Sequence, residues 1–188
     1  IETLVNLLES HQAISTGIFD VPSCKVVTKS QYTQGTPNPL VRTRSKEHMR
    51  QPDTGIALLD FDQDQYMPEN MRNNSPEELM AKLVSAVPEL EGVGYSAVGS
   101  SSNGIFDEKT GTPYSGGGGM HVYIAVKGIE LDQFRKFLKA RLWNAGLGYI
   151  SFARNGFILE RTLFDLSVLS PERLIYEAPP VLRSEEHT

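Results

Sequence analysis

An apolar run that ends in two carboxylates constrains this chain more than any other feature. Residues 56–59 read Ile-Ala-Leu-Leu and lead directly into Asp60-Phe61-Asp62. An unbroken apolar run of this length predicts a strand buried on both faces, which requires a sheet with further structure packed on it. Side chains two apart share one face of a strand, so Asp60 and Asp62 project together while Phe61 points into the packing.

This pair of carboxylates predicts a metal site. Two adjacent carboxylates repel each other unless a cation lies between them. Oxygen ligands with an open side suit Mg²⁺ or Mn²⁺, and a pair of such ions is what phosphoryl transfer uses. The other interpretation is a solvated strand end that runs into an acidic loop, which Asp64 continues. The motif alone leaves both interpretations open.

The rest of the chain alternates between helical and strand patterns. Ser75-Pro76 followed by Glu78 predicts a capped helix start, and Asn155-Gly156 predicts a two-residue hairpin turn. The expected helices cover 1–13, 76–87 and 131–145; the expected strands cover 24–28, 56–62, 93–98, 121–126, 149–153 and 157–159; and loops cover 31–54 and 99–119. This order predicts an α+β fold with helices on one face of a sheet.

Length and composition bound the organisation. The chain has 188 residues, 39% of them hydrophobic, which fits a single domain. We divide it into an N-terminal part (1–54) with a basic loop, a core (55–180) and a tail or linker (181–188). Cys24 is the one cysteine, which excludes an internal disulfide and a multi-cysteine zinc site, so no zinc is expected. No membrane partner is expected, and the expected location is the cytoplasm.

The net charge of −5 argues against binding nucleic acid by overall charge alone. A local basic patch would be required, and the densest one consists of Arg42, Arg44, Lys46 and Arg50. These side chains are candidates for contacts with DNA phosphates. The basic residues of helix 131–145 lie off its apolar stripe, and we favour a solvated face there over template contact.

Two further features could carry chemistry. Four glycines, residues 116–119, precede His121 at the start of a strand, and a glycine run lets backbone N–H groups approach an anion closely. Asp165 stands between apolar neighbours, where a carboxylate is costly unless it is paired or bound to a metal. Each feature also has an ordinary structural interpretation: a flexible loop, a structural histidine, a helix cap or a salt bridge.

The order of these signals resembles the archaeo-eukaryotic primase superfamily. The resemblance rests on a strand ending in Asp60-Phe61-Asp62, on Gly119-Met120-His121 at the head of a strand, and on Phe164-Asp165. Residues 165–180 and 119–124 also resemble primase–polymerases carried by phages, plasmids and integrated elements. The resemblance covers about residues 55–180. Gly119 departs from it, because many members have serine there.

The resemblance implies a two-lobed core with an RNA-recognition-motif-like antiparallel sheet and packed helices. It implies that Asp60, Asp62 and Asp165 are catalytic and hold two Mg²⁺ or Mn²⁺ ions. The residues implied to bind the nucleotide are His121, Gly119, Ser100, Ser101 and Arg161. The implied activity is template-directed DNA primase and DNA polymerase chemistry, in replication of a mobile element or in repair.

The implied partners are a DNA template or primer and NTPs or dNTPs, with a helicase on the same chain or separate from it. A bacterial, phage or plasmid origin would fit. Two alternatives stay open: another metal-dependent phosphotransferase or nuclease, and a nucleic-acid-binding module of the same fold that has lost its chemistry. A nicking initiator fits less well, because His121 has no histidine partner two residues away.

Overall fold

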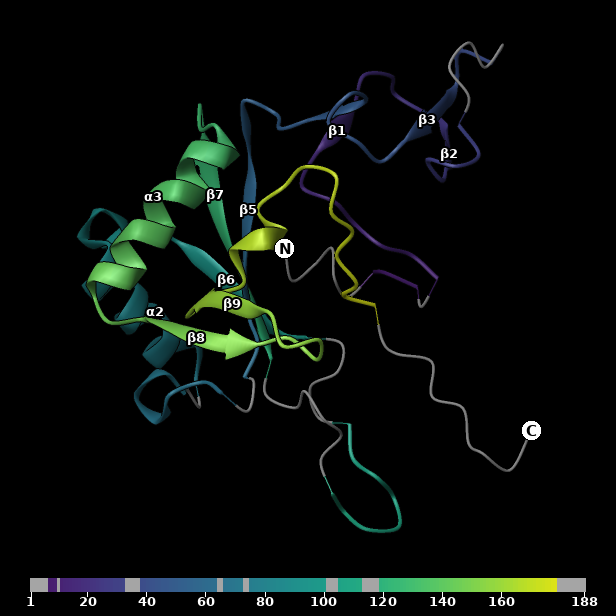
Figure 1. The fold of residues 1–188 in the computed structure, drawn as a ribbon. Coiled ribbons are helices and arrows are strands. Elements are labelled where there is room, and N and C mark those ends of the chain that lie inside the picture. The colour runs from purple at the N-terminus through teal and green to yellow at the C-terminus, as the bar shows by residue number, and fades with distance from the viewer. Residues whose placement is uncertain are drawn as a thin grey trace.

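The structure, a computed structural model, describes residues 7–9, 11–32, 38–63, 66–72, 75–100, 105–112 and 119–178. It is a mixed α+β fold (Figure 1). Its helices are α2 (Pro76–Ala86) and α3 (Leu131–Asn144), with short 3₁₀ turns η1 (Glu69–Met71), η2 (Pro88–Leu90) and η3 (Leu166–Val168). Its strands are β1 (Ile18–Phe19), β2 (Lys25–Val27), β3 (Val41–Thr43), β4 (Met49–Arg50), β5 (Thr54–Phe61), β6 (Tyr95–Gly99), β7 (Met120–Lys127), β8 (Gly148–Phe152) and β9 (Ile158–Thr162).

The largest sheet is antiparallel and has the strand order β5-β7-β6. The register between β5 and β7 places Asp60 directly opposite His121. On the other edge of β5, an isolated antiparallel bridge joins Asp60 to Asp165. Smaller sheets pair β1 with β4, β2 with β3, and β8 with β9. Of these, the β2–β3 pair is parallel.

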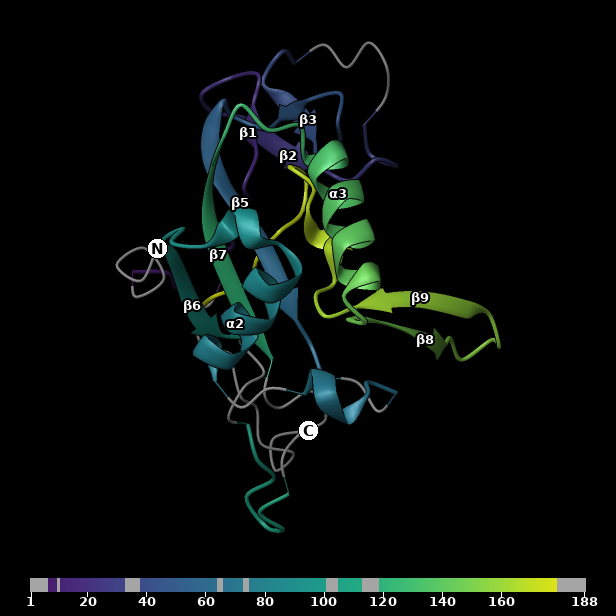
Figure 2. The same cartoon turned by 90° about the vertical axis from the view of Figure 1, so that its left-hand side faces the viewer.

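One face of the large sheet packs on both helices. Leu59 and Phe61 of β5 lie in one buried cluster with Leu83 of α2 and Leu138 of α3. The helices lie on the left of the sheet in Figure 1; in Figure 2, α2 lies in front of the sheet and α3 lies to the right of β5. Leu59, Phe61, Leu83 and Leu138 are all fully buried. The expectation of helices on one sheet face is therefore confirmed.

The opposite face packs on the end of the described chain. Leu58 and Tyr123 form a second buried cluster with Ile175, and Ile14 packs beside them. Backbone hydrogen bonds join Ile14 and Ile175 in both directions, at 3.0 and 2.8 Å. The strand that carries Asp60 is thus buried on both faces, as the apolar run predicts.

Local signals set the boundaries of several elements. The Ser75 hydroxyl accepts a hydrogen bond from the Glu78 backbone N–H at 3.2 Å, which caps α2 as predicted. The β8–β9 hairpin also forms, but a two-residue turn was the wrong prediction. The Gly156 N–H donates to the Ala153 carbonyl, and Gly156 has a φ of 83°. The loop is therefore three residues long, and the glycine occupies its left-handed position after the turn.

The N-terminal part differs most from expectation. A helix over 1–13 is wrong for residues 7–9 and 11–13, which are not helical; residues 1–6 and 10 lie outside the described residues. The expected loop over 31–54 contains β3 and β4, which its polar composition did not indicate because these strands are very short. Among the described residues, no helix is both long enough and apolar enough to cross a membrane.

Candidate active site

Three of the predicted residues form a row across neighbouring chain segments. Asp60 lies between Asp165 on one side and His121 on the other, through the bridge and the β5–β7 register. Residues directly opposite each other on neighbouring strands share a face of the sheet. This face is the one opposite the helices, because Asp60 alternates with the helix-facing residues Leu59 and Phe61.

A backbone hydrogen bond holds Asp165 next to Asp60. The Asp165 N–H donates to the Asp60 carbonyl at 2.7 Å. Its side-chain Oδ1 accepts from the Ser167 N–H at 2.9 Å and so caps η3, while Oδ2 lies 3.9 Å from Nη1 of Arg161. The ordinary roles of a cap and an ion pair are therefore both present. These contacts do not move the Asp165 carboxylate away from Asp60.

Asp62 lies at the same end of β5. The pKa of its carboxyl is raised, first because burial disfavours the charged form and next because Asp60 lies close. Asp165 raises it further, while His121 and Arg161 act in the opposite direction. The three carboxylates therefore share one electrostatic environment in which negative charge accumulates.

Gly119 allows Asp62 and Ser100 to approach the start of β7. A Cβ at position 119 would lie 2.7 Å from the Ser100 Oγ and 3.0 Å from the Asp62 Oδ1. The first distance is too short for a real Cβ and the second is tight, so the Ser100 hydroxyl would have to move to admit a side chain. The space that a serine would use at position 119 is thus occupied by the hydroxyl of Ser100.

His121 is held between two carboxylates. Its Nε2 lies 3.4 Å from the Asp60 Oδ1, and its Nδ1 lies 2.5 Å from the Glu177 Oε1. Burial acts to lower the pKa of the imidazole, but the interactions with Asp60 and Glu177 outweigh it and raise the pKa to about 9. His121 is therefore a cation at neutral pH.

Glu177 is a site residue that the sequence analysis missed. Its side chain is 1% exposed, and it accepts a hydrogen bond from the Tyr123 hydroxyl as well as contacting His121. Burial, followed by the bond to Glu177, raises the pKa of Tyr123. One signal could have found this residue: a tyrosine on a buried strand needs a partner for its hydroxyl, and a buried carboxylate is a suitable acceptor.

The carboxylates fit a divalent cation by their chemistry. The Asp60 Oδ1 is buried and has no hydrogen-bond donor among the described residues, since the contact with His121 has the distance of an ion pair but not the geometry of a hydrogen bond. Burial and then the neighbouring Asp60 raise the pKa of the Asp62 carboxyl, and a bound cation would favour its charged form again. As the side chains stand, no group of three histidine, cysteine or acidic residues in the described ranges is arranged to hold a metal ion.

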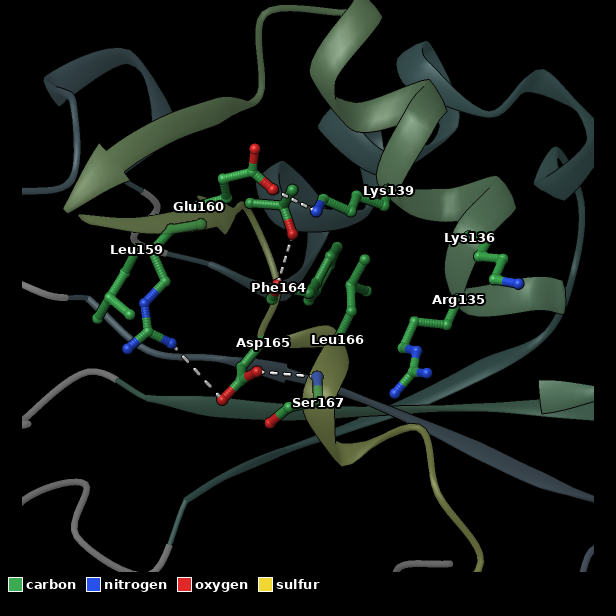
Figure 3. Close-up of a pocket in the computed structure, with 11 residues that line it drawn as sticks. Arg135, Lys136, Lys139, Leu159, Glu160, Phe164, Asp165, Leu166 and Ser167 are labelled. Carbon is green, nitrogen blue, oxygen red and sulfur yellow. Dashed lines mark hydrogen bonds and ion pairs between the residues drawn. The ribbon is translucent and has the colours of Figure 1, made fainter. Parts of the chain in front are cut away.

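Three cavities adjoin these residues. The first, of 270 Å³, is lined by Asp60, Asp62, Ser100, His121 and Arg173, among others. The second, of 230 Å³, is lined by Asp62, Arg161 and Asp165. The third, of 480 Å³, includes Arg161 and Asp165 and extends to α3 (Figure 3). The carboxylates therefore stand where neighbouring cavities meet.

The other predicted nucleotide-binding residues have mixed outcomes. Ser100 and Gly119 lie beside Asp62, and Arg161 lies beside Asp165. Ser101 lies outside the described residues. Arg173, a candidate phosphate contact because it lies close in sequence to Asp165, lines the cavity that contains His121.

The structure does not gather the predicted DNA-binding cluster into one free patch. Three of its members make intramolecular contacts: Arg42 pairs with Asp20 at 2.6 Å, Arg44 donates to the Glu172 carbonyl at 3.2 Å, and Lys46 pairs with Asp132 at 2.9 Å. Arg50 is exposed. Their contact with DNA stays a prediction.

Comparisons of this chain with known protein families, with curated proteins and with solved structures find no match.

Proposed function

We propose that this chain is a catalytic domain of primase–polymerase type, which joins nucleotides on a nucleic-acid template. The observation that carries the proposal is the row of Asp165, Asp60 and His121 at one end of the sheet, with Asp62 beside it. These residues come from three separate segments of the chain. They are the residues that the resemblance to archaeo-eukaryotic primases marks as catalytic or nucleotide-binding.

The chain order around the row supports the same family. The elements β5-α2-β6-β7-α3 follow the order of a split βαβ unit, and the sheet order β5-β7-β6 fits it. The bridge from Asp165 to Asp60 stands where a fourth strand would pair with β5. This arrangement supports an RNA-recognition-motif-like sheet. The small sheets β1–β4 and β2–β3 would belong to the second lobe.

The residues divide the work between them. Asp60, Asp62 and Asp165 would hold the two Mg²⁺ or Mn²⁺ ions, which supply activation of the attacking 3′-hydroxyl and charge neutralisation on the phosphates. His121, a cation at neutral pH, donates to phosphate oxygens of the incoming nucleotide in the 270 Å³ cavity. Arg173 lines the same cavity and adds positive charge for the triphosphate.

Glu177 fixes the orientation of His121. It binds Nδ1 and leaves Nε2 on the side of Asp60. A histidine held in this way presents one defined N–H to the phosphate and does not rotate. No protein nucleophile is needed, because the attacking hydroxyl belongs to the growing strand or to the first nucleotide.

Primer extension tests the proposal. Purified protein is incubated with a single-stranded template, a labelled primer, NTPs or dNTPs, and Mg²⁺ or Mn²⁺, alongside reactions without primer. The variants Asp60→Asn, Asp62→Asn and Asp165→Asn should each lower the extension rate by about a hundredfold or more. Asp53→Asn is the matched control, because this exposed aspartate lies just before the opposite end of β5.

The products separate the proposal from its rivals. Extension whose sequence follows the template supports a primase–polymerase, and products without primer show that it starts strands unaided. Addition that ignores the template indicates a different nucleotidyltransferase. Shortening of the labelled strand without nucleotides indicates a nuclease. Near-normal rates in any of the three aspartate variants would show that the metal assignment is wrong.

A further inference from the structure

The 480 Å³ cavity beside the carboxylates carries positive charge that the proposed chemistry does not use. Four cationic side chains line it, and three of them lie near carboxylates: Lys139 pairs with Glu160 at 2.5 Å, Arg135 pairs with Asp132 at 3.0 Å, and Arg161 lies 3.9 Å from Asp165. These cations are Arg135, Lys136, Lys139 and Arg161. The chain has a net charge of −5, whereas the cations that line this cavity outnumber the lining carboxylates by two. The pairs of Arg135 and Lys139 lie at exposed positions, where ion pairs contribute little and can be exchanged for phosphate contacts.

The three cations of α3 form one stripe. Arg135, Lys136 and Lys139 are spaced one and three or four residues apart, which places them on one side of the helix. In Figure 3, Arg135 extends beside Leu166 and Ser167, and Lys139 extends toward Glu160. The charges are thus spread along about one helical turn and do not converge on a single point. A spread of this kind suits a chain of phosphates better than one compact phosphate group.

Arg161 connects the stripe to the catalytic row. It lines both the 480 Å³ cavity and the 230 Å³ cavity that contains Asp62. Its Nε is buried and has no hydrogen-bond acceptor among the described residues. The rest of the side chain is partly open, since it is 40% exposed and its Nη1 lies 3.9 Å from the Asp165 Oδ2, so the guanidinium can take a phosphate oxygen as a further acceptor. An anion in this cavity would therefore lie beside the carboxylates.

The hairpin that supplies Arg161 also exposes large apolar side chains. Phe152 is 52% exposed, Phe157 is 70% exposed and Ile158 is 67% exposed. Phe152 and Ile158 are directly opposite each other in the β8–β9 register, and Phe157 lies next to Ile158. Figure 2 shows that this hairpin projects from the rest of the fold. The cavity is lined by Leu159, Glu160, Arg161 and Thr162 of the same hairpin, so Phe157 precedes the lining residues along the chain by two positions. Exposed aromatic rings combined with cations bind single-stranded nucleic acid, through base stacking and phosphate contacts.

We propose that this surface, formed by the α3 cations, Arg161 and the aromatic end of the hairpin, binds the single-stranded template. The α3 cations hold its phosphates, Phe157 stacks on a base, and the strand continues toward Asp165. The inference rests on the proposed function for the identity of the strand. The incoming nucleotide is proposed for the cavity that contains His121, which shares no lining residue with this one. Arg161, which the resemblance implies to bind the nucleotide, is here assigned to the template.

The test measures binding without catalysis. A fluorescein-labelled oligothymidylate of about 20 nucleotides covers a typical single-strand site, and its anisotropy gives the Kd in EDTA over a series of salt concentrations. Arg135→Gln/Lys136→Gln/Lys139→Gln should weaken binding by about tenfold or more and reduce the salt slope by about two. Phe157→Ala should weaken binding by about tenfold and leave the salt slope unchanged.

A control variant removes the same number of charges elsewhere. Lys29→Gln/Lys127→Gln/Arg141→Gln has the same net charge as the triple variant, and none of its three positions lines the 480 Å³ cavity. It should bind within about twofold of the parent protein. The single variant Lys136→Gln, at an exposed position, preserves the fold and should show part of the same loss. Circular dichroism confirms that each variant is folded.

Three results would overturn the inference. The first is that the parent protein does not bind the oligonucleotide. The second is that the triple variant and its control lose the same affinity. The third is that nucleoside triphosphate alone displaces the oligonucleotide from this surface. Equal binding by Phe157→Ala and the parent protein would remove the hairpin from the surface. The binding assay measures no nucleotide transfer, so the two proposals can fail separately. If the variants bind as expected but the parent protein extends no primer, the proposed function is rejected and this binding surface is kept. If the triple variant extends primers normally and binds the oligonucleotide as well as the parent protein does, this binding surface is rejected and the proposed function is kept.

Discussion

The contact of Glu177 with His121 and Tyr123 allows one prediction to be worked out in magnitude. Replacing Glu177 with leucine leaves the Tyr123 hydroxyl and the His121 Nδ1 without their shared acceptor. Both groups are buried or nearly so: Tyr123 is 2% exposed and the His121 side chain is 13% exposed. An unsatisfied buried polar group costs about 1–3 kcal/mol, and breaking a buried charged pair costs about 3–5 kcal/mol. We expect Glu177→Leu to lower the free energy of unfolding by about 3–5 kcal/mol.

Glu177→Gln separates charge from shape. The amide keeps an oxygen that can accept from Tyr123 but loses the negative charge that faces the imidazolium. The expected loss is about 1–2 kcal/mol, the difference between a hydrogen bond to a charged group and one between neutral groups. A typical domain has a free energy of unfolding of about 5–15 kcal/mol, and the leucine variant could lose much of it. The glutamine variant loses less, so its unfolding can still be measured.

Urea unfolding followed by circular dichroism measures both losses, from the midpoint and the slope m. Tyr123→Phe completes a double-mutant cycle: it should cost about 1 kcal/mol alone and distinctly less in the Glu177→Leu background. The reasoning is refuted if Glu177→Leu stays within about 0.5 kcal/mol of the parent protein, as a surface substitution would. Additive losses of Tyr123→Phe and Glu177→Leu would equally refute a shared contact.

Three further substitutions follow from the structure. Ser75→Ala removes the cap of α2 and should lower stability by about 0.5–2 kcal/mol in urea unfolding, whereas Ser75→Asn should retain it. Leu83→Ala empties a fully buried position and should cost about 2–5 kcal/mol in the same assay; a loss below 1 kcal/mol would contradict the packing of α2 on the sheet. Gly119→Ala introduces a Cβ only 2.7 Å from the Ser100 Oγ and should cost about 1–3 kcal/mol by thermal or urea unfolding, with part of the loss recovered when Ser100→Ala is added. No recovery in that double variant would show that Ser100 is not the neighbour that matters.

The sequence predicted the strands and helices that local pattern controls. The alternation of side chains on a strand placed Asp60 and Asp62 together, and the Ser75-Pro76 signal placed the start of α2. Local pattern did not reveal that residues 7–9 and 11–13 are not helical, because leucine spacing alone does not provide a partner surface for a helix. It also missed β3 and β4, since strands of three and two residues have too few side chains to show alternation.

The candidate site was predicted in part for a similar reason. The meeting of Asp165 with Asp60 was expected only from the resemblance to archaeo-eukaryotic primases. The contact of Glu177 with His121 joins residues 56 positions apart and has no local pattern. The basic loop was predicted as a DNA contact from its density of charge. Density does not show which charges find internal partners, and Arg42 pairs with Asp20 across 22 positions.

The Asp60–Asp165 bridge is isolated, so the position of Asp165 depends on the packing of the core around it. His121 is aligned by a complete ladder of paired residues, whereas Asp165 is aligned by a single bridge. What anchors Asp165 is the apolar pair just before it, Leu163 and Phe164, each 1% exposed. A substitution that loosens either anchor would shift the third carboxylate although it touches no reacting atom. If the chain is the proposed primase–polymerase, a change in the size of either buried side chain would therefore alter its catalytic rate.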